Sequence, residues 1–149
     1  MNKLATIMFA FGLSMSGAAL PVMAQAPAAA GNSEPAKVIY HVNNSAGQAL
    51  GALRNMRNQL DTEPNTKIVL VAHADGIEFL ETDYKDAATV GPLISGLAAR
   101  GVHFEVCQIT MKRKNKTNDD FVMEAEFVPS GVVRITQLQN KEGYAYIKP

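Results

Sequence analysis

The stretch "TKIVLVAHADG", residues 66–76, carries the strongest information about the fold class. Its residues from Ile68 to Ala72 form an unbroken apolar run. Such a run is typical of a strand that is covered on both faces, and parallel sheets flanked by helices are built from strands of this kind. His73 and Asp75 follow at once, so we expect them just beyond the carboxyl end of a buried strand.

The segment before this run predicts a strand followed by a helix. Residues 37–43, "KVIYHVN", are rich in β-branched and aromatic side chains, and turn-forming residues follow them. Over residues 45–63, apolar side chains then recur at the spacing of one helix face: Ala49, Leu53, Met56 and Leu60. Pro64 should end this helix.

The segments after residue 76 repeat the alternation. A second helix is expected to carry Val90, Leu93, Ile94, Leu97 and Ala98 on one face. Gly91 and Pro92 suit its first turn, and Arg100 and Gly101 close it. A strand over 102–107, a short helix from 108, a short strand in "AEFVPSG", a last helix and a final strand in "YAYIK" follow. In the last helix we expect Val132, Ile135 and Leu138 on the inner side. The pattern predicts an α/β fold with a mainly parallel sheet of about five strands and helices on both faces.

The N-terminus has the features of a secretory signal peptide. Lys3 precedes an apolar stretch, and "VMA" and "AQA" offer cleavage sites after Ala24 or Ala26. Glycines and serines within the stretch, and Pro21 after it, disfavour the alternative of a retained membrane anchor. We therefore expect a signal peptide over 1–24, a flexible leader over 25–35 and one domain over 36–149. The mature protein would be periplasmic or secreted from a bacterium, without membrane contact after cleavage.

Composition limits the possible partners and cofactors. The 149 residues hold 14 basic and 14 acidic side chains, so net charge gives no reason to expect a nucleic acid partner. The glycines lack the spacing of a nucleotide-binding loop, and we predict no cofactor. A basic run over residues 112–116 is most simply a solvated helix end, although it could dock an acidic protein surface.

The single cysteine, Cys107, is the candidate reactive group. It cannot form an internal disulfide, and it ends a predicted strand just before a helix, where amides and the helix dipole favour a thiolate. The carboxyl ends of parallel strands meet at one edge, so a pocket there should also collect four polar residues: Asn43, Asn44, His73 and Asp75. The alternative is a buried cysteine that only fills space. For His73, bonds to a loop carbonyl and to Asp75 are the simplest expectation, whereas His41 and His103 receive no role.

Four segments together make the chain resemble the DsrE family, in an exported, signal-bearing branch: "KVIYHVNN", "KIVLVAHADGIEFL", "LAARGVHFEVCQITM" and "VPSGVVRITQLQNKEGYAYIKP". The resemblance implies a three-layer α/β/α fold and oligomeric assembly. In the sulfur-relay members a cysteine carries sulfane sulfur as a persulfide, and only Cys107 has a clear counterpart there. Those members are cytoplasmic and hetero-oligomeric, whereas this chain looks exported, so we expect a homo-oligomer with a protein sulfur donor or acceptor.

Two classes of function remain open at this point. The first is a sulfur-handling protein, at most a sulfurtransferase-like carrier, with Cys107 as the persulfide-bearing residue. The second is a non-catalytic module that binds a small ligand, or a soft metal such as copper, through Cys107 and His73. Cysteine and histidine alone are too few ligands for a closed zinc site, and we assign no metal ligands. A cysteine hydrolase would need an orienting group and an oxyanion pocket that the sequence does not specify.

Overall fold

The computed structural model describes residues 34–149. The predicted signal peptide and all but the last two residues of the predicted leader lie outside this range. Eleven elements follow in order: β1 (Lys37–Asn44), α1 (Ser45–Thr62), β2 (Lys67–Asp75), the 3-10 helix η1 (Glu78–Leu80), α2 (Ala87–Ala98), β3 (His103–Cys107), α3 (Gln108–Arg113), the 3-10 helix η2 (Asn118–Asp120), β4 (Ala125–Val128), α4 (Gly131–Glu142) and β5 (Ala145–Ile147). Within the described range, no helix is both long enough and apolar enough to cross a membrane.

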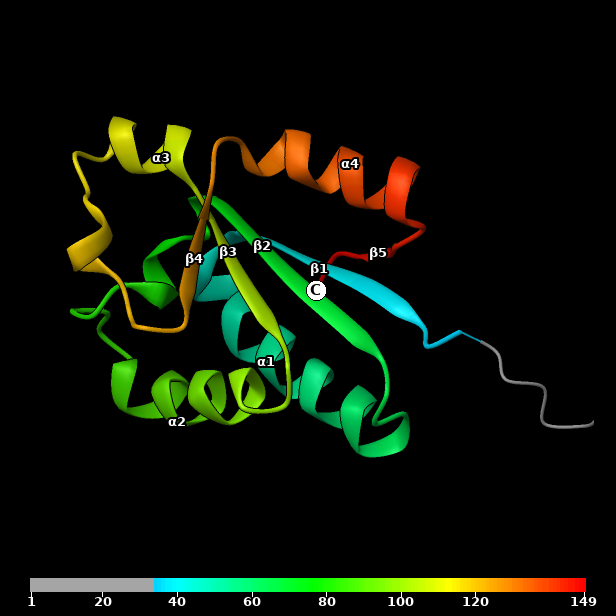
Figure 1. Cartoon of the computed structure of the whole chain (residues 1–149). Helices are drawn as coiled ribbons and strands as arrows, with labels where there is room; N and C mark the ends of the chain where they lie inside the picture. The colour runs from blue at the N-terminus through cyan, green and yellow to red at the C-terminus, as the bar shows by residue number, and fades with distance from the viewer. Residues whose placement is uncertain (1–33) are drawn as a thin grey trace, which may run out of the picture. The chain divides into compact units, whose positions relative to one another are not determined.

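The strands form one five-stranded parallel sheet in the order β4-β3-β2-β1-β5. Helices α1 and α2 cover one face, and α4 covers the other, with α3 on the same side as α4 (Figure 1). The predicted α/β architecture, with about five strands and helices on both faces, is confirmed. The apolar run of β2 occupies the central position, which explains why both of its faces are buried.

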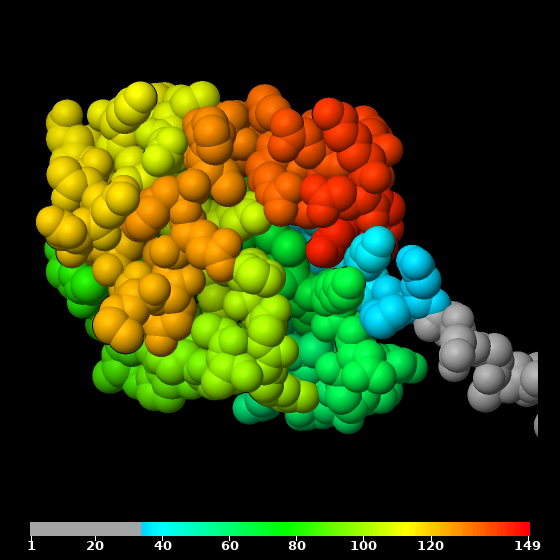
Figure 2. All heavy atoms as spheres, in the orientation of Figure 1, coloured from blue at the N-terminus to red at the C-terminus, as the bar shows by residue number. Residues whose placement is uncertain are grey.

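Local sequence explains how α1 begins and how α4 ends. The Asn44 side chain caps α1 by accepting a hydrogen bond of 2.8 Å from the Gly47 amide. The four apolar residues predicted for the inner face of α1 are all buried. Helix α4 ends at Gly143, whose φ of 73° lies in the left-handed region that favours glycine. This turn returns the chain to the edge of the sheet, where β5 pairs with β1, and Figure 2 shows the red C-terminal segment beside the cyan N-terminal segment.

Two details of the predicted helices are wrong. Pro92 lies inside α2 and not in its first turn, because the helix already begins at Ala87. Its ring is exposed, so the missing amide falls on the outer side of the helix. Val132 is 58 % exposed, although Ile135 and Leu138 are buried as expected. Side chains six residues apart point in directions about 120° apart around a helix, so one narrow face cannot bury both Val132 and Leu138.

The two faces of the sheet differ in polarity. Toward α1 and α2 the strands present a continuous apolar core that includes Leu70 and Phe104. The core toward α4 is smaller: Ile39, Val69, Val71, Ile135 and Leu138. An ion pair supports it, because Arg134 Nε donates to both carboxylate oxygens of the buried Glu105, at 3.0 and 2.9 Å. Burial is the largest influence on Glu105 and raises its pKa despite the nearby guanidinium.

Candidate functional site

The alternation of side chains brings three functional groups onto the α4 face at the carboxyl edge. Ile39 and Val71 face α4, so His41 and His73, two residues further along β1 and β2, point the same way. On β3, Glu105 faces Arg134 of α4, and Cys107 follows two residues later. Polar and reactive groups therefore replace the apolar core near the start of α4.

Gly131, the first residue of α4, lies directly between Cys107 and His73. A methyl group placed on Gly131 would lie 3.3 Å from the Cβ atoms of both residues. Contacts this close require displacement of the neighbours, so the absence of a side chain lets the start of α4 approach both strands. Cys107 and His73 are thus neighbours across two adjacent strands, as the sequence predicted for the sheet edge.

The Cys107 thiol is buried, with 5 % of the residue exposed, and it is surrounded by hydrogen-bond donors. Burial on its own raises its pKa, but the nearby backbone amides of Gly131, Thr110 and Ile109 and the Thr110 hydroxyl outweigh it and lower the pKa. The Cys107 side chain itself makes no capping hydrogen bond to α3. The amides and the hydroxyl come from the first turns of α3 and α4. These groups therefore offset the effect of burial and favour ionisation of the thiol, in a position that bulk water reaches poorly.

Thr110 connects the Cys107 region to the carboxyl end of β2. Its hydroxyl oxygen accepts a hydrogen bond of 3.1 Å from the Ala74 amide, and the same hydroxyl is one of the groups that lower the pKa of Cys107. Ala74 adopts a left-handed backbone conformation, with φ of 51°, and such a conformation is unfavourable for a residue with a side chain. The turn next to His73 is therefore held in an uncommon geometry that directs an amide at Thr110.

A short hydrogen-bonded chain leads from His73 to the surface. His73 Nε2 lies 2.6 Å from His41 Nε2, and His41 Nδ1 lies 2.6 Å from the Tyr146 hydroxyl. Burial and the Lys148 ammonium lower the pKa of both histidines, that of His41 to about 4, and for His41 the second imidazole adds to the effect. Both rings are therefore neutral near pH 7, with one proton between the two Nε2 atoms.

The remaining predicted residues have other partners. Asp75 does not bind His73; its carboxylate accepts a hydrogen bond of 2.8 Å from Lys114, which lowers the pKa of Asp75. Asn44 caps α1, and Asn43 Oδ1 accepts a hydrogen bond from Lys148. A small cavity of about 230 Å³ joins His73 and Asp75 to Thr110 and Arg113. This cavity takes in His73 and Asp75 but not Cys107, Asn43 or Asn44, and the two asparagines instead organise the neighbouring end of β1.

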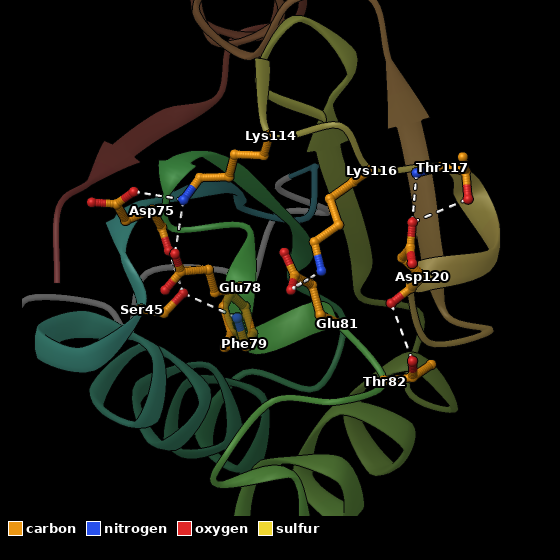
Figure 3. Close-up of polar contacts among 10 residues, drawn as sticks. All are labelled: Ser45, Asp75, Glu78, Phe79, Glu81, Thr82, Lys114, Lys116, Thr117 and Asp120. Atoms are coloured by element: carbon orange, nitrogen blue, oxygen red, sulfur yellow. Dashed lines mark hydrogen bonds and ion pairs between the residues drawn. The ribbon is translucent and has the colours of Figure 1, made fainter. Parts of the chain in front are cut away.

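Part of the basic run is neutralised within the fold. Lys114 donates to Asp75 and Glu78, both at 2.8 Å, and Lys116 lies 2.8 Å from Glu81 (Figure 3). These pairs tie the loop after α3 to the segment around η1, and the Thr82 amide adds a hydrogen bond of 2.9 Å to the Asp120 carbonyl. The expectation of a solvated helix end is therefore wrong for Lys114 and Lys116.

Residues 34–149 contain no cluster of three or more His, Cys, Asp or Glu side chains placed to hold a metal ion. His73 directs Nε2 toward His41, and the Lys148 ammonium lies close enough to affect both rings. A positive charge beside the pair disfavours a bound cation for the same reason that it disfavours imidazolium. The geometry is better suited to holding a thiolate and neutral imidazoles than to metal coordination.

His41 and Tyr146 are among the contributors to which the sequence gave no role, as are Thr110, Gly131 and Lys148. His41 looked like an ordinary strand residue, and Tyr146 lies 105 positions away from it in the sequence. One signal was available, because His41 stands at the position of β1 where the α4 face of the sheet turns from apolar to polar. That signal has meaning only once the order of the strands is known.

The model of the DsrE/DsrF-like family matches residues 21–149. A solved protein of unknown function from Methanobacterium thermoautotrophicum is similar, with 29 % identity, a TM-score of 0.70, and coverage of 76 % of this chain and 99 % of that one. The ychN protein from E. coli has 13 % identity and a TM-score of 0.63, with coverage of 77 % and 99 %, and shares the fold. None of the curated proteins compared with the chain matches it.

Proposed function

The chain belongs to the DsrE/DsrF-like family, and from this premise we propose that it is an exported sulfur carrier that holds sulfane sulfur on Cys107 as a persulfide. The observation that carries the proposal is the set of donors around Cys107. Three backbone amides and one hydroxyl near the sulfur lower its pKa in spite of its burial. A thiolate is the form that attacks sulfane sulfur.

The proposed transfer needs only a thiolate and a donor persulfide. The Cys107 thiolate attacks the outer sulfur of a donor R–S–SH, a new S–S bond forms, and the S–S bond of the donor breaks. The donor leaves as the thiolate R–S⁻, and Cys107 carries –S–SH. The charge and the number of sulfur atoms balance, and no external oxidant or reductant is consumed.

Burial of Cys107 fits the carrier role in one respect. A persulfide is lost readily to other thiols, and a sulfur that is 5 % exposed is shielded from them. The same burial is what a packing cysteine would have, so burial does not favour either reading. The nearby hydrogen-bond donors favour the carrier, because a cysteine that only fills space has no need of several groups that stabilise its charged form.

The decisive experiment compares sulfur loading in the native protein and in Cys107→Ser. The protein is incubated with a persulfide donor, and intact-mass spectrometry without reductant detects the added sulfur. We expect one sulfur per chain on the native protein and none on Cys107→Ser. Met123→Ala is the matched control, because that side chain is 97 % exposed and its loss should leave loading unchanged.

Alkylation rates measured against pH give a second test. If the pKa of Cys107 is lowered, its alkylation rate should reach half of the maximum at a pH below about 8.5, the pKa of a free cysteine. If labelling is slow at every pH, sulfur loading is absent and Cys107→Ser lowers the melting temperature strongly, Cys107 is a packing residue. That combined result would remove the basis for a carrier.

Export and assembly are parts of the same proposal. We expect the native protein to begin at Gln25 or Pro27, so N-terminal sequencing that finds Met1 would contradict export. We also expect a homo-oligomer that exchanges sulfur with a protein partner. A monomeric mass by light scattering across micromolar concentrations would contradict the assembly.

The alternative of a ligand-binding module keeps one supporting observation. The cavity of about 230 Å³ beside His73 and Thr110 could hold a small molecule without any chemistry at Cys107. Protein isolated from its native compartment separates the two functions, because bound sulfur supports the carrier and a retained ligand or metal supports the module.

A further inference from the structure

The buried ion pair between Glu105 and Arg134 lies close to Cys107 and has no role in the sulfur transfer described above. Glu105 is 4 % exposed and stands two residues before Cys107 on β3, on the same face of the sheet. Arg134 Nε donates to both of its carboxylate oxygens, at 3.0 and 2.9 Å. The cost of removing two charges from water offsets much of their attraction, so stability alone does not explain a buried pair at this place.

The buried apolar contacts of α4 are made with strands other than the one that carries Cys107. The cluster that holds Ile135 and Leu138 draws its sheet residues from β1 and β2: Ile39, Val69 and Val71. On β3, the residues that face α4 are polar or reactive: His103, Glu105 and Cys107. Within residues 34–149, no ion pair other than that of Arg134 with Glu105 joins α4 to β3. This pair therefore fixes α4 over the strand of the cysteine.

A cavity beside α4 leaves room for the helix to move. It has a volume of about 260 Å³ and is lined at the end of β4 by Val128 and along α4 by Val133, Arg134 and Gln137. Atoms that line a cavity lack packing partners on that side. The helix is therefore held weakly toward β4, and the link to Glu105 is what keeps its first turn from shifting.

The first turn of α4 is the part of the helix that acts on Cys107. A Cβ on Gly131 would lie 3.3 Å from the Cys107 Cβ, so the helix backbone is in close contact with the cysteine. Burial raises the pKa of the thiol, and the Gly131 amide is the strongest of the groups that lower it. The Ser130 side chain does not cap the helix, so its hydroxyl does not compete for the amides of this turn. The Arg134 amide donates to the Ser130 carbonyl at 2.9 Å, so Arg134 closes the turn that begins at Gly131.

From this arrangement we infer that Arg134 and Glu105 are positioning residues: their ion pair holds the first turn of α4 against Cys107 and thereby sets the reactivity of the thiol. The inference rests on the proposed function, because the thiolate is the form that accepts sulfur, and it adds two residues on which that form depends. The pair is neutral as a whole. Its effect on Cys107 therefore comes from the position of α4 and not from a net charge.

The test measures the ionisation of Cys107 directly. Cys107 is the only cysteine in the chain, so the ultraviolet absorbance of the thiolate against pH reports this residue even where no reagent reaches it. In each case the matching Cys107→Ser protein is subtracted, which removes the signal of the tyrosines. The main variant combines Arg134→Met with Glu105→Gln, so that both charges are lost and no buried carboxylate is left unpaired. We expect its Cys107 pKa to exceed the native value by at least about 0.5 unit, a fall of about threefold in the ratio of thiolate to thiol at a given pH.

Two controls separate position from stability. Glu142→Gln removes the other carboxylate that binds Arg134, 2.9 Å from Nη1 and on α4 itself, and should keep the native Cys107 pKa. Leu60→Ala weakens the core on the opposite face of the sheet, so it should lower stability in urea and still keep the native Cys107 pKa. Arg134→Lys keeps the charge but loses the planar guanidinium, so its Cys107 pKa should lie between those of the native protein and the double variant. This variant carries the test if the double variant does not fold.

A native Cys107 pKa in the double variant, or in Arg134→Lys where only that variant folds, would overturn the inference. An equal shift in Leu60→Ala would also overturn it, because the effect would then follow lost stability. Sulfur loading of the same proteins separates the inference from the carrier proposal. No loading of the native protein, together with a raised pKa in the double variant, would overturn the carrier alone. Loading of the native protein, together with a native pKa in the double variant, would overturn the positioning role alone.

Discussion

Mild acid should destabilise the native protein through His41. In the folded chain its pKa is lowered to about 4, because burial, Lys148 and His73 all disfavour the imidazolium. In the unfolded chain the pKa returns to about 6.5. The folded state therefore binds fewer protons than the unfolded state below about pH 6.5, and stability falls as the pH is lowered toward 4.

The difference in pKa sets the size of the effect. Linkage between these two pKa values gives a loss of at most about 2 kcal/mol between about pH 7 and about pH 5. His41 is only partly buried, so solvent screening reduces this figure, and we expect about 1 kcal/mol. The pKa of His73 is also lowered, which acts in the same direction.

Urea unfolding at the two pH values measures the effect. The native protein should lose about 1 kcal/mol more than His41→Gln, because carboxylates that titrate in both proteins cancel in the difference. His103→Gln is the matched control. It changes an exposed histidine at the start of β3, away from the carboxyl edge of the sheet, and should keep the native response. Equal losses in the native protein and His41→Gln would show that the histidine pair is not linked to folding as argued.

Three further predictions concern stability. Gly76→Ala should unfold the protein or cost more than about 3 kcal/mol, because a Cβ there would lie 2.2 Å from the Val42 carbonyl oxygen; a thermal melt within a few degrees of native would contradict this. Arg134→Met should cost about 3 kcal/mol at neutral pH by leaving Glu105 buried and unpaired, and adding Glu105→Gln should recover much of the loss in urea titrations. Phe104→Ala should cost about 3–5 kcal/mol, since Phe104 is fully buried, whereas Met123→Ala should stay within about 0.5 kcal/mol; similar losses in both variants would exclude the core assigned to Phe104.

Elements with a strong local pattern could be predicted from the sequence. Three features were enough to predict the order of strands and helices along the chain and a parallel sheet: the apolar run of β2, the spacing along α1 and the residues that end each helix. The position of Cys107 at a strand end before a helix was also available, since it depends on neighbours in the chain. Local boundaries failed where two signals competed, as at Pro92, where a residue suited to a first turn lies inside α2.

The site is different, because its parts come from distant segments. His41 and His73 meet only because β1 and β2 are adjacent and in register, and Tyr146 joins them because β5 lies beside β1. The partner of Asp75 is Lys114, from the far end of α3, where the sequence suggested His73. Such pairs depend on strand order and on the direction of side chains, and neither is encoded in local periodicity.

The sequence by itself determined that this protein is a parallel α/β domain with one cysteine at the carboxyl edge of its sheet, because hydrophobic periodicity and helix boundaries act over a few residues. Only the tertiary structure decided that the cysteine is buried among donors from two helices, that two histidines share a hydrogen bond beside it, and that Glu81 is buried with one oxygen unpaired within residues 34–149. Burial, pKa and unmet hydrogen bonds are set by atoms brought together from different elements, so they exist only after the chain has folded.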